Sequence, residues 1–385
     1  MNISYIINEL GEERGNYFNA IAPPIIQTSN FAFSKVDEMR KAFEDEYSTY
    51  LYSRGLNPTV DILCKKLAAL DNAEDCLVFN SGAAAIFAAV LANVKSGDHI
   101  VSVDRPYTWA QKMFNDILPR FNVAVTYIDG TSIENFERAI LPNTTLIYLE
   151  SPNSWDFAIQ DLRAVAELAR AEDIATICDN SYCTPIYQRP IEFGIDLVLQ
   201  SATKYIGGHS DVVAGILSGS STMIKRIFDH EYLNIGSGIQ PFNAWLLIRG
   251  LRTLPARLER ISASTLKVIS FLKQHPLIEA VIFPFNDDFP QLKLAKSQMQ
   301  GACGLLTFIM KAEDIHQIET FCERLKHILM AVSWGGHESL IIPRCSSLPQ
   351  SSFDPANKEH RMLRLYVGLE DPQYLVDDLQ QALQT

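Results

Sequence analysis

Between residues 76 and 218, short apolar runs alternate with longer stretches in which apolar residues recur every three or four positions. The short runs predict β-strands and the longer stretches predict amphipathic helices. The expected strands cover residues 76–79, 99–104, 123–129, 145–150, 174–179, 196–201 and 212–218, and the expected helices cover 83–94, 107–121, 131–140 and 162–172. Repeated strand–helix units of this spacing predict an α/β fold with a mostly parallel sheet and helices on both faces.

The pattern changes after about residue 222. Two helices are expected over residues 241–254 and 257–274, and apolar runs at 280–283, 304–310 and 363–367 predict strands separated by helices. We therefore expect an N-terminal arm over residues 1–45, a large domain over 46–240 and a small α+β domain over 241–385. The arm lacks clean periodicity, and such an arm is often used to embrace a neighbouring subunit.

Composition and charge narrow the class of protein. The chain has 385 residues, of which 47% are apolar and 20% charged, as is ordinary for a globular protein with a sizeable core. A formal net charge of −12 argues against a nucleic-acid partner and against binding to an anionic membrane surface. Seven cysteines without paired spacing indicate reduced thiols and supply no credible metal site. No secretory signal is evident, and the apolar stretch 83–94 is too short to span a bilayer, so we expect a cytoplasmic protein.

One lysine stands directly after the expected strand 196–201. Lys204 lies beside two hydroxyl residues, Ser201 and Thr203, and before the pair Gly207-Gly208. Because an ammonium is costly to bury without a partner, a lysine here makes sense if its amine forms a Schiff base with pyridoxal phosphate (PLP). Ser201 and Thr203 would then donate to the phosphate. A surface lysine after a strand is the plain alternative.

Other polar residues lie at the predicted strand ends, which is where open α/β sheets bind ligands. Ser81-Gly82 opens a helix, whose N–H groups and dipole would hold a phosphate. Tyr107 could stack on the pyridine ring, and Asp179 would pair with its nitrogen. Each residue alone also has a structural explanation, such as a capped turn for Asp179 or core packing for Tyr107. The prediction therefore rests on their occurrence together.

Two alternatives from other classes remain. Ser201-x-x-Lys204 matches the nucleophile motif of serine acyl-enzymes, but that motif needs a distant Lys-Thr-Gly, which this sequence lacks. A catalytically inactive binding subunit is the second, and the intact Lys204, Asp179 and Tyr107 argue against it. The sequence also lacks the glycine motifs of dinucleotide-binding and P-loop proteins.

Motifs spread over residues 52–371 together resemble the trans-sulfuration enzymes of the Cys/Met metabolism PLP family. They are residues 52–59 (YSRGLNPT), 81–82 (SG), 179–180 (DN), 201–211 (SATKYIGGHSD), 249–254 (RGLRTL), 333–340 (SWGGHESL) and 364–371 (RLYVGLED). The resemblance implies PLP-dependent transferase fold type I, which is aspartate-aminotransferase-like, with PLP as cofactor and an amino acid as substrate.

The resemblance also implies roles around the cofactor. Lys204 would carry PLP and shuttle the proton at the substrate Cα, with Tyr107 as a second catalytic residue. The expected cofactor-binding residues are Lys204, Asp179, Tyr107, Ser81, Gly82, Ala83, Ser201, Thr203, Tyr52 and Arg54. Ala83 stands where the family often has Met or Leu, but only its backbone N–H is needed.

Further roles concern the substrate and a neighbouring subunit. Arg364 would bind the substrate α-carboxylate, helped by Ser333 and Asn153. Tyr52 and Arg54 would reach the cofactor phosphate of a neighbouring subunit, in a homotetramer built from two active dimers. In the loop after Asn153, the pair at residues 154–155 (SW) replaces an Asn-Pro that is common in the family.

Three residues expected near the substrate bear on the reaction. Val332 stands where cystathionine γ-synthases and γ-lyases typically place a glutamate, and Trp109 stands where methionine γ-lyases carry a cysteine. Trp334, after Ser333, looks like the bacterial cystathionine β-lyases. These residues favour a carbon–sulfur β-lyase that converts L-cystathionine to homocysteine, pyruvate and ammonia. The alternative is γ-elimination or γ-replacement, as in the γ-lyases and γ-synthases, because the motif residues serve both.

Overall fold

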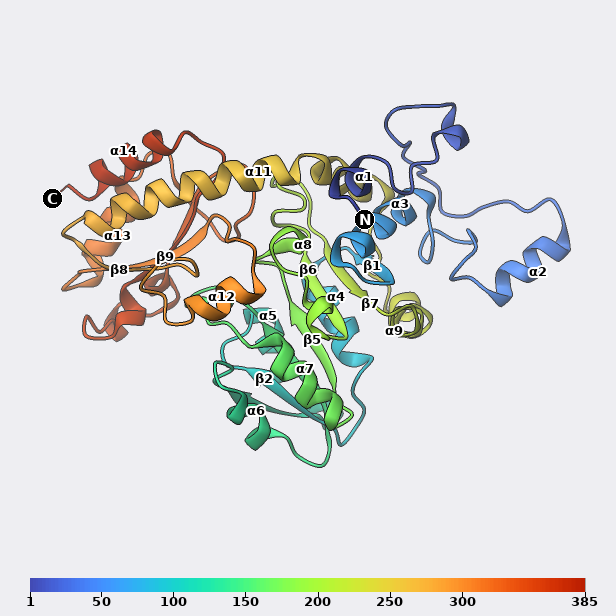
Figure 1. The fold of residues 1–385 in the computed structure, drawn as a ribbon, viewed down its shortest axis with the longest axis horizontal. Helices are drawn as coiled ribbons and strands as arrows, with labels where there is room; N and C mark the ends of the chain where they lie inside the picture. Colours follow the sequence, from blue (N-terminus) through green and yellow to red (C-terminus); the bar gives the residue numbers. More distant parts are fainter. Residues whose placement is uncertain (385) are drawn as a thin grey trace.

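A seven-stranded sheet forms the centre of the large domain in the computed structural model, which describes residues 1–384. Thr385, the last residue of the predicted small domain, lies outside the described residues. The strand order is β1-β7-β6-β5-β4-β2-β3, and β7 alone runs antiparallel to its neighbours β6 and β1. The strands are β1 Asp75–Phe79, β2 His99–Val103, β3 Ala124–Ile128, β4 Thr144–Glu150, β5 Ala175–Asp179, β6 Leu197–Ser201 and β7 Gly215–Gly219. The predicted mostly parallel sheet is confirmed (Figure 1).

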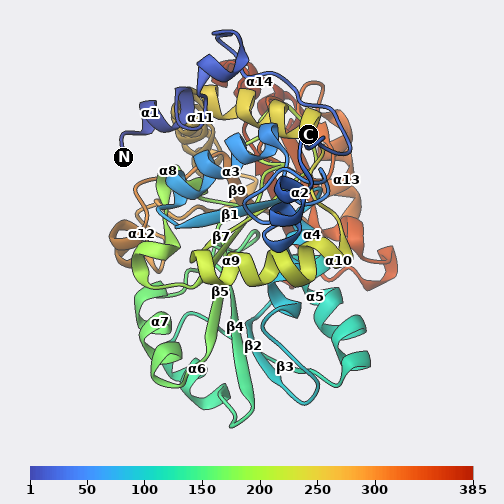
Figure 2. The ribbon, with the colours of Figure 1, turned by 90° about the vertical axis from the view of Figure 1, so that its right-hand side faces the viewer.

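Helices cover both faces of this sheet, as predicted. Helices α4 (Gly82–Leu91) and α5 (Thr108–Lys112) pack through Ile86 and Ala110 on one face, whereas α6 (Ile133–Ala139) and α7 (Leu162–Ala171) pack through Phe136 and Val165 on the other (Figure 2). Because both faces are covered, all five residues of β2 are buried. The remaining helices of this part are α3 Pro58–Asp71, α8 Thr184–Tyr187, α9 Ser221–Ile227 and α10 Leu233–Ile235.

The C-terminal part contains a second sheet of five strands in the order β10-β11-β12-β9-β8. The strands are β8 Ile278–Ile282, β9 Leu305–Met310, β10 Leu329–Met330, β11 Leu340–Pro343 and β12 Met362–Tyr366, and the helices are α12 Leu292–Gln298, α13 Ile315–Arg324 and α14 Pro372–Ala382. The three strands expected here correspond to β8, β9 and β12. The short strands β10 and β11 were not predicted.

A single helix, α11 (Pro241–Gln274), replaces the two helices expected over 241–254 and 257–274. It contains Pro255 in its interior, within the gap between the two predicted helices, although proline removes one helical hydrogen bond. Near the proline, Arg257 Nη2 and Thr253 Oγ1 donate to the Gly250 carbonyl at 2.9 and 3.2 Å. Buried apolar residues lie on both sides of Pro255, so α11 is packed along both stretches. It runs along both parts of the molecule (Figure 1).

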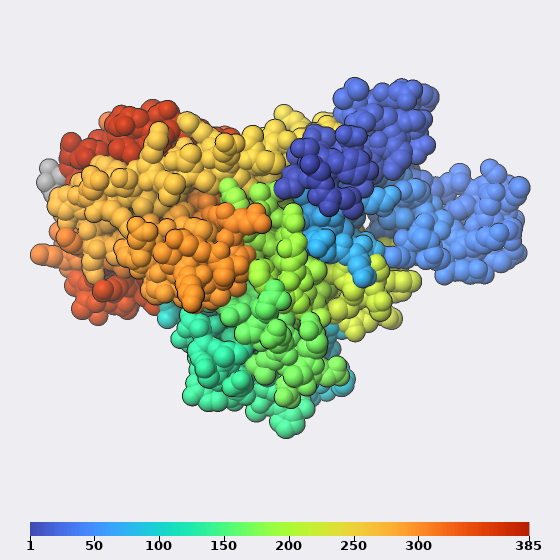
Figure 3. All heavy atoms as spheres, viewed as in Figure 1, coloured from blue at the N-terminus to red at the C-terminus, as the bar shows by residue number. Residues whose placement is uncertain are grey.

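The N-terminal arm contains the short helices α1 (Ile3–Asn8) and α2 (Val36–Glu44). The arm is anchored at α1, because the buried Lys66 amine donates to the carbonyls of Ile6 and Ile7 and forms an ion pair of 3.0 Å with Glu12. Residues around α2 project away from the rest of the chain (Figure 3). Across residues 1–384, no helix is both long enough and apolar enough to cross a membrane. The division into three parts stays a prediction, as does the cytoplasmic location.

Candidate active site

Lys204 lies just beyond the carboxyl end of β6, in a turn that several bonds fix. Its N–H donates to the Ser201 carbonyl at 3.1 Å, and its carbonyl accepts from Gly208 N at 2.8 Å. Gly208 has a φ of +67°, which a residue with a side chain rarely adopts. Behind the turn, the buried Arg257 donates through Nη1 to the Tyr205 carbonyl at 2.7 Å. The backbone around Lys204 is therefore held from both sides.

The Lys204 amine lies in a mostly buried environment. Nζ donates to Ser333 Oγ at 2.6 Å and lies 5.3 Å from the centroid of the Trp334 ring. Burial, reinforced by the charge of Arg364, lowers the pKa of Lys204 to about 8, although Asp179 acts in the opposite direction. A much larger fraction of this amine is therefore neutral near pH 7 than for an ordinary lysine, as a nucleophile and general base requires.

The loop that carries Ser333 approaches Lys204 closely. Ser333 has a φ of +85°, and a Cβ on Gly335 would lie 2.8 Å from the Lys204 Cα. Trp334 is buried against the ring of Tyr205 at a centroid distance of 5.3 Å. The predicted substrate residues Ser333 and Trp334 are therefore both brought to Lys204. Val332 beside them is 82% exposed.

Asp179 and Tyr107 lie on the same edge of the sheet as Lys204. Asp179 ends β5, is buried and accepts from the Ser181 N–H at 2.9 Å. Burial raises the pKa of Asp179, whereas the bonds from Ser181 and the charge of Lys204 act against this. Tyr107 precedes α5, and burial together with the charges of Asp179 and Glu150 raises the pKa of its phenol.

Glu150 is a site residue to which the sequence analysis gave no role. It ends β4 beside Asp179, and its two oxygens accept from the N–H groups of Tyr107 and Ser154 at 2.6 and 3.1 Å. Burial and the neighbouring Asp179 raise the pKa of Glu150 to about 8. Its position at a strand end, next in register to Asp179, was the signal that could have identified it. Glu150 fixes both loops that border the site.

Arg364 reaches the site from β12 in the C-terminal part. Burial lowers the pKa of Arg364 to about 10, although Glu150 acts in the opposite direction. Nη1 makes a long contact of 3.5 Å to the Ser154 carbonyl. Because a guanidinium offers five donors, this group retains donors for a ligand carboxylate. Asn153 differs from expectation, because its amide donates to the Arg105 carbonyl at 2.8 Å and accepts from Trp155 N at 3.1 Å, so it supports the loop.

The N-terminus of α4 lies where a phosphate group is expected. Ser81 caps the helix by accepting from Ala84 N at 3.1 Å, whereas the Gly82 and Ala83 N–H groups have no acceptor within residues 1–384. Gly215 lets β7 pass so close that a Cβ there would lie 2.3 Å from the Ser81 carbonyl oxygen. The side chain of Ser201 contacts a Cβ built on Gly82 at 3.4 Å.

These residues fit pyridoxal phosphate, because helix N–H groups, a carboxylate and a lysine amine match its phosphate, its ring nitrogen and its aldehyde. One expected phosphate ligand is engaged elsewhere. The Thr203 hydroxyl donates to the Ala214 carbonyl at 3.2 Å and accepts from Ala214 N at 3.0 Å. Tyr52 and Arg54 do not join the site within the described chain. They are exposed and stack on each other, with Arg54 Cζ 5.6 Å from the Tyr52 ring centroid.

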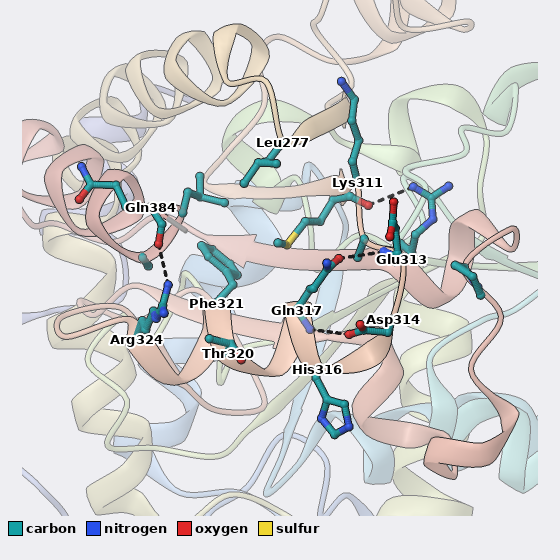
Figure 4. A pocket seen from close by; sticks show the side chains of 16 residues that line it. Leu277, Lys311, Glu313, Asp314, His316, Gln317, Thr320, Phe321, Arg324 and Gln384 are labelled. Carbon is teal, nitrogen blue, oxygen red and sulfur yellow. Dashed lines mark hydrogen bonds between the residues drawn. The ribbon is translucent and has the colours of Figure 1, made fainter.

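A cavity of about 730 Å³ lies elsewhere, between α13 and the C-terminal end of α14 (Figure 4). Its lining includes Leu277, Phe321 and Arg324, and it contains none of the site residues described above. Its cations are already paired, since Arg324 donates to the Gln384 carbonyl at 2.6 Å and Lys311 to the Pro276 carbonyl at 2.8 Å. This cavity offers no group for the chemistry considered above.

Curated relatives and solved structures resemble this chain over nearly its whole length. The L-methionine gamma-lyase of Treponema denticola is 37% identical over 379 residues, which cover 96% of this chain and 93% of that protein. The cystathionine gamma-lyase of Sus scrofa is 35% identical over 369 residues, which cover 94% of this chain and 89% of that protein. The structure of metB from Corynebacterium glutamicum has a TM-score of 0.91 at 31% identity and covers 100% of this chain and 98% of its own.

A further solved structure bears on the cofactor. The putative O-acetylhomoserine (thiol)-lyase metY from Campylobacter jejuni has a TM-score of 0.93 at 26% identity, with 100% of both chains covered, and contains N'-pyridoxyl-lysine-5'-monophosphate. Fold type I and PLP as the cofactor are thereby confirmed. The family model described as "Cys/Met metabolism PLP-dependent enzyme" matches residues 5–384. With that match over nearly the whole chain and the residues that fit PLP at one edge of the sheet, the chain belongs to the Cys/Met metabolism PLP-dependent enzymes.

Proposed function

We propose that this protein is a PLP-dependent carbon–sulfur lyase that releases a thiol from the γ-carbon of a sulfur amino acid, leaving 2-oxobutyrate and ammonia. The observation that carries the proposal is the convergence of Lys204, Asp179 and Arg364 at one edge of the sheet. The lysine supplies a titratable amine, the aspartate a partner for a protonated ring nitrogen, and the arginine a fork for the substrate carboxylate.

Different residues of the site would bind different parts of the cofactor. Asp179 would pair with the ring nitrogen, and Tyr107 would cover the ring. The free N–H groups of Gly82 and Ala83, with the Ser201 hydroxyl, would bind the phosphate. When bound through Lys204, PLP supplies an electron sink for the negative charge that develops at the substrate Cα.

Lys204 is the group that moves protons. Its amine, once freed by the substrate amine, would take the proton from Cα and deliver it to the carbon of PLP that carried the aldehyde. The amine, neutral again, would then take a proton from Cβ for elimination at the γ-carbon. The hydrogen bond to Ser333 Oγ, at 2.6 Å, holds Nζ in position. Tyr107 keeps its phenolic proton near neutral pH, because burial and two carboxylates raise its pKa, so it can protonate the departing thiolate.

The relatives support elimination at the γ-carbon rather than the β-elimination that the sequence favoured. The two curated relatives described above are named L-methionine gamma-lyase and cystathionine gamma-lyase. Removal of methanethiol from methionine breaks the bond between Cγ and sulfur. We therefore favour the γ-lyase alternative over the main sequence-based prediction.

Cleavage of L-cystathionine at the β-carbon remains a second candidate for one specific reason. The residue before Ser333 is an exposed valine, Val332, at the place where cystathionine γ-synthases and γ-lyases typically have a glutamate. The buried Trp334 gives this part of the site an apolar wall beside the Lys204 amine. These two residues are the ones on which the β-elimination prediction rested, together with the exposed Trp109.

Product analysis of the purified holoenzyme distinguishes the candidates. With L-methionine, γ-elimination yields methanethiol, 2-oxobutyrate and ammonia. With L-cystathionine, γ-elimination yields cysteine and 2-oxobutyrate, whereas β-elimination yields homocysteine and pyruvate. Release of pyruvate from L-cystathionine, with no product from L-methionine, would replace our proposal by the β-lyase. The Lys204→Ala protein serves as the blank for non-enzymatic breakdown.

We also propose that the active form is a homotetramer of two active dimers, in which Tyr52 and Arg54 complete the phosphate site of a neighbouring subunit. Both side chains are exposed and bond to no other site residue of their own chain within residues 1–384. The arm also exposes apolar side chains, since Phe18 is fully exposed and Phe43 is 66% exposed. Light scattering gives the assembly, and PLP affinity of Arg54→Ala tests the phosphate contact.

A further inference from the structure

The loop from Asn153 to Trp155 holds an aromatic ring against two guanidinium groups. The Cζ atom of Arg364 lies 5.0 Å from the centroid of the Trp155 ring, and that of Arg344 lies 4.9 Å from it. Trp155 is half-buried, so one indole ring contacts both cations from the edge of the site. Interactions of this geometry stabilise a cation most when the pair is shielded from water.

Arg364 has few other contacts that fix its orientation. The long 3.5 Å contact to the Ser154 carbonyl is the one hydrogen bond its side chain makes among residues 1–384, and it forms no ion pair within 4.0 Å there. Bidentate binding of a carboxylate needs the guanidinium plane to face the ligand. The contact with the Trp155 ring is therefore the second interaction that fixes this group.

The ring itself is fixed by a closed set of contacts across both domains. Arg344, in the C-terminal part, forms an ion pair of 3.1 Å with Glu359, and Glu359 also forms an ion pair with Arg105 of the large domain. The Arg105 carbonyl accepts from the Asn153 amide, whose oxygen in turn accepts from Trp155 N. Trp155 is therefore held at its backbone N–H by Asn153 and at its ring by Arg344.

We propose that Trp155 is a positioning residue for the substrate α-carboxylate, because its ring holds the Arg364 guanidinium in the plane that a bidentate carboxylate requires. This inference rests on the proposed function insofar as that function assigns Arg364 to the carboxylate. It accounts for the tryptophan at a place where the motif comparison expected a proline. Trp155 does not touch the reacting atoms. Its loss should therefore weaken carboxylate binding and leave the proton transfers of Lys204 unchanged.

The test compares Trp155→Leu and Trp155→Phe in the holoenzyme, using 4-(methylthio)butanoate as the probe. This acid has the carboxylate and side chain of methionine but lacks the amine, so it binds without reacting with PLP. Calorimetric titration should give a Kd about tenfold higher for Trp155→Leu than for the unsubstituted protein, because leucine removes the cation–π contact. For Trp155→Phe, which keeps an aromatic ring, the Kd should be less than about threefold higher. For L-methionine, KM should rise by about the same tenfold factor while kcat changes by less than about twofold.

Phe193→Leu is the matched control. It removes another contact of this kind, with Arg163 Cζ 5.4 Å from the Phe193 ring, at a place remote from the site residues. It should change neither the Kd nor the KM. An unchanged Kd in Trp155→Leu, an equal loss in the leucine and phenylalanine variants, or a fall in kcat and Tm without a change in Kd would each overturn the proposal.

The binding measurement also separates this inference from the proposed function. If the unsubstituted holoenzyme binds the acid but releases no product from L-methionine, the γ-lyase proposal fails while the comparison of Trp155 variants still reports on Arg364. If the unsubstituted holoenzyme does not bind the acid, Arg364 is not a carboxylate site and the role of Trp155 is refuted.

Discussion

Glu150 and Asp179 are paired in register at the carboxyl ends of the neighbouring parallel strands β4 and β5, and both carboxyl groups are buried. Adjacent strands lie about 4.8 Å apart, so the two carboxyl groups are close together in a region shielded from water. Glu150 lies nearer the loops, where it accepts from Tyr107 N and Ser154 N. The pair links the residue that would hold the cofactor ring nitrogen to the loops that carry Tyr107 and Trp155.

Replacement of Glu150 by Gln should change how stability depends on pH. Burial and Asp179 raise the folded-state pKa of Glu150 to about 8, above the ordinary unfolded value. The stabilisation from its protonated form is complete below the unfolded pKa and is lost as pH rises through about 8. Glutamine lacks this titration. The Tm difference between Glu150→Gln and the unsubstituted protein, both without cofactor, should therefore rise by about 3 °C between pH 5 and pH 8.5.

Glu134→Gln provides the control, because Glu134 is an exposed acid on α6 and is far from the site residues. Its Tm difference should stay nearly constant over the same range. A Tm difference for Glu150→Gln that stays flat, or falls with pH, would mean that Glu150 is ionised in the folded protein at neutral pH.

Replacement of Lys204 by Ala should abolish turnover while the fold remains. The amine is needed both to hold PLP covalently and to move protons, so kcat should fall by more than about 10³-fold. Circular dichroism and Tm should stay close to those of the unsubstituted protein, because the Ala side chain leaves the turn bonds of residue 204 in place. Retained activity in a correctly folded Lys204→Ala protein would contradict the mechanism.

The rate at which the cofactor-free protein binds PLP covalently should depend on pH, because it follows the ionisation of the Lys204 amine. Because the pKa of Lys204 is lowered to about 8, the neutral amine increases from roughly a tenth of the molecules at pH 7 to roughly nine tenths at pH 9. The rate of covalent capture, followed by the visible absorbance, should rise by about tenfold over that range. A rise centred near the ordinary lysine pKa would show that the amine is not buried as described.

The sequence predicted the large sheet well because each strand there is an apolar run that both faces bury, as in β2. It failed where tertiary contacts override a local signal. Pro255 indicated a break in the helix, yet α11 continues through it, with buried apolar residues on both sides of the proline. The local sequence around a proline does not show whether packing on both sides will hold the helix together.

For the site, the predicted strand ends contained Lys204, Asp179 and Tyr107, which lie at one edge because parallel strands bring their carboxyl ends together. Contacts between segments far apart in the sequence could not be predicted from the strand ends. Ser333 was expected at the substrate carboxylate, but its hydroxyl accepts from the Lys204 amine across 129 positions of sequence. The role of Glu150 likewise depends on its register with β5, which periodicity does not give.

The last prediction concerns the close approach of β7 to the N-terminus of α4. A Cβ on Gly215 would lie 2.3 Å from the Ser81 carbonyl oxygen and 2.8 Å from the Gly82 Cα. Both are backbone atoms, so Gly215→Ala must displace the helix end whose N–H groups would bind the phosphate. We expect the Kd for PLP to rise at least about tenfold and the Tm to fall by a few degrees.

Gly15→Ala is the matched control for that prediction, because it makes the same chemical change where a Cβ meets no atom within 4 Å and φ is not positive. It should leave PLP affinity unchanged. The two variants share any loss of unfolded-state entropy from Gly→Ala, so the difference between them reports the clash alone. Equal PLP affinity in Gly215→Ala and Gly15→Ala would mean that the phosphate does not bind at the N-terminus of α4.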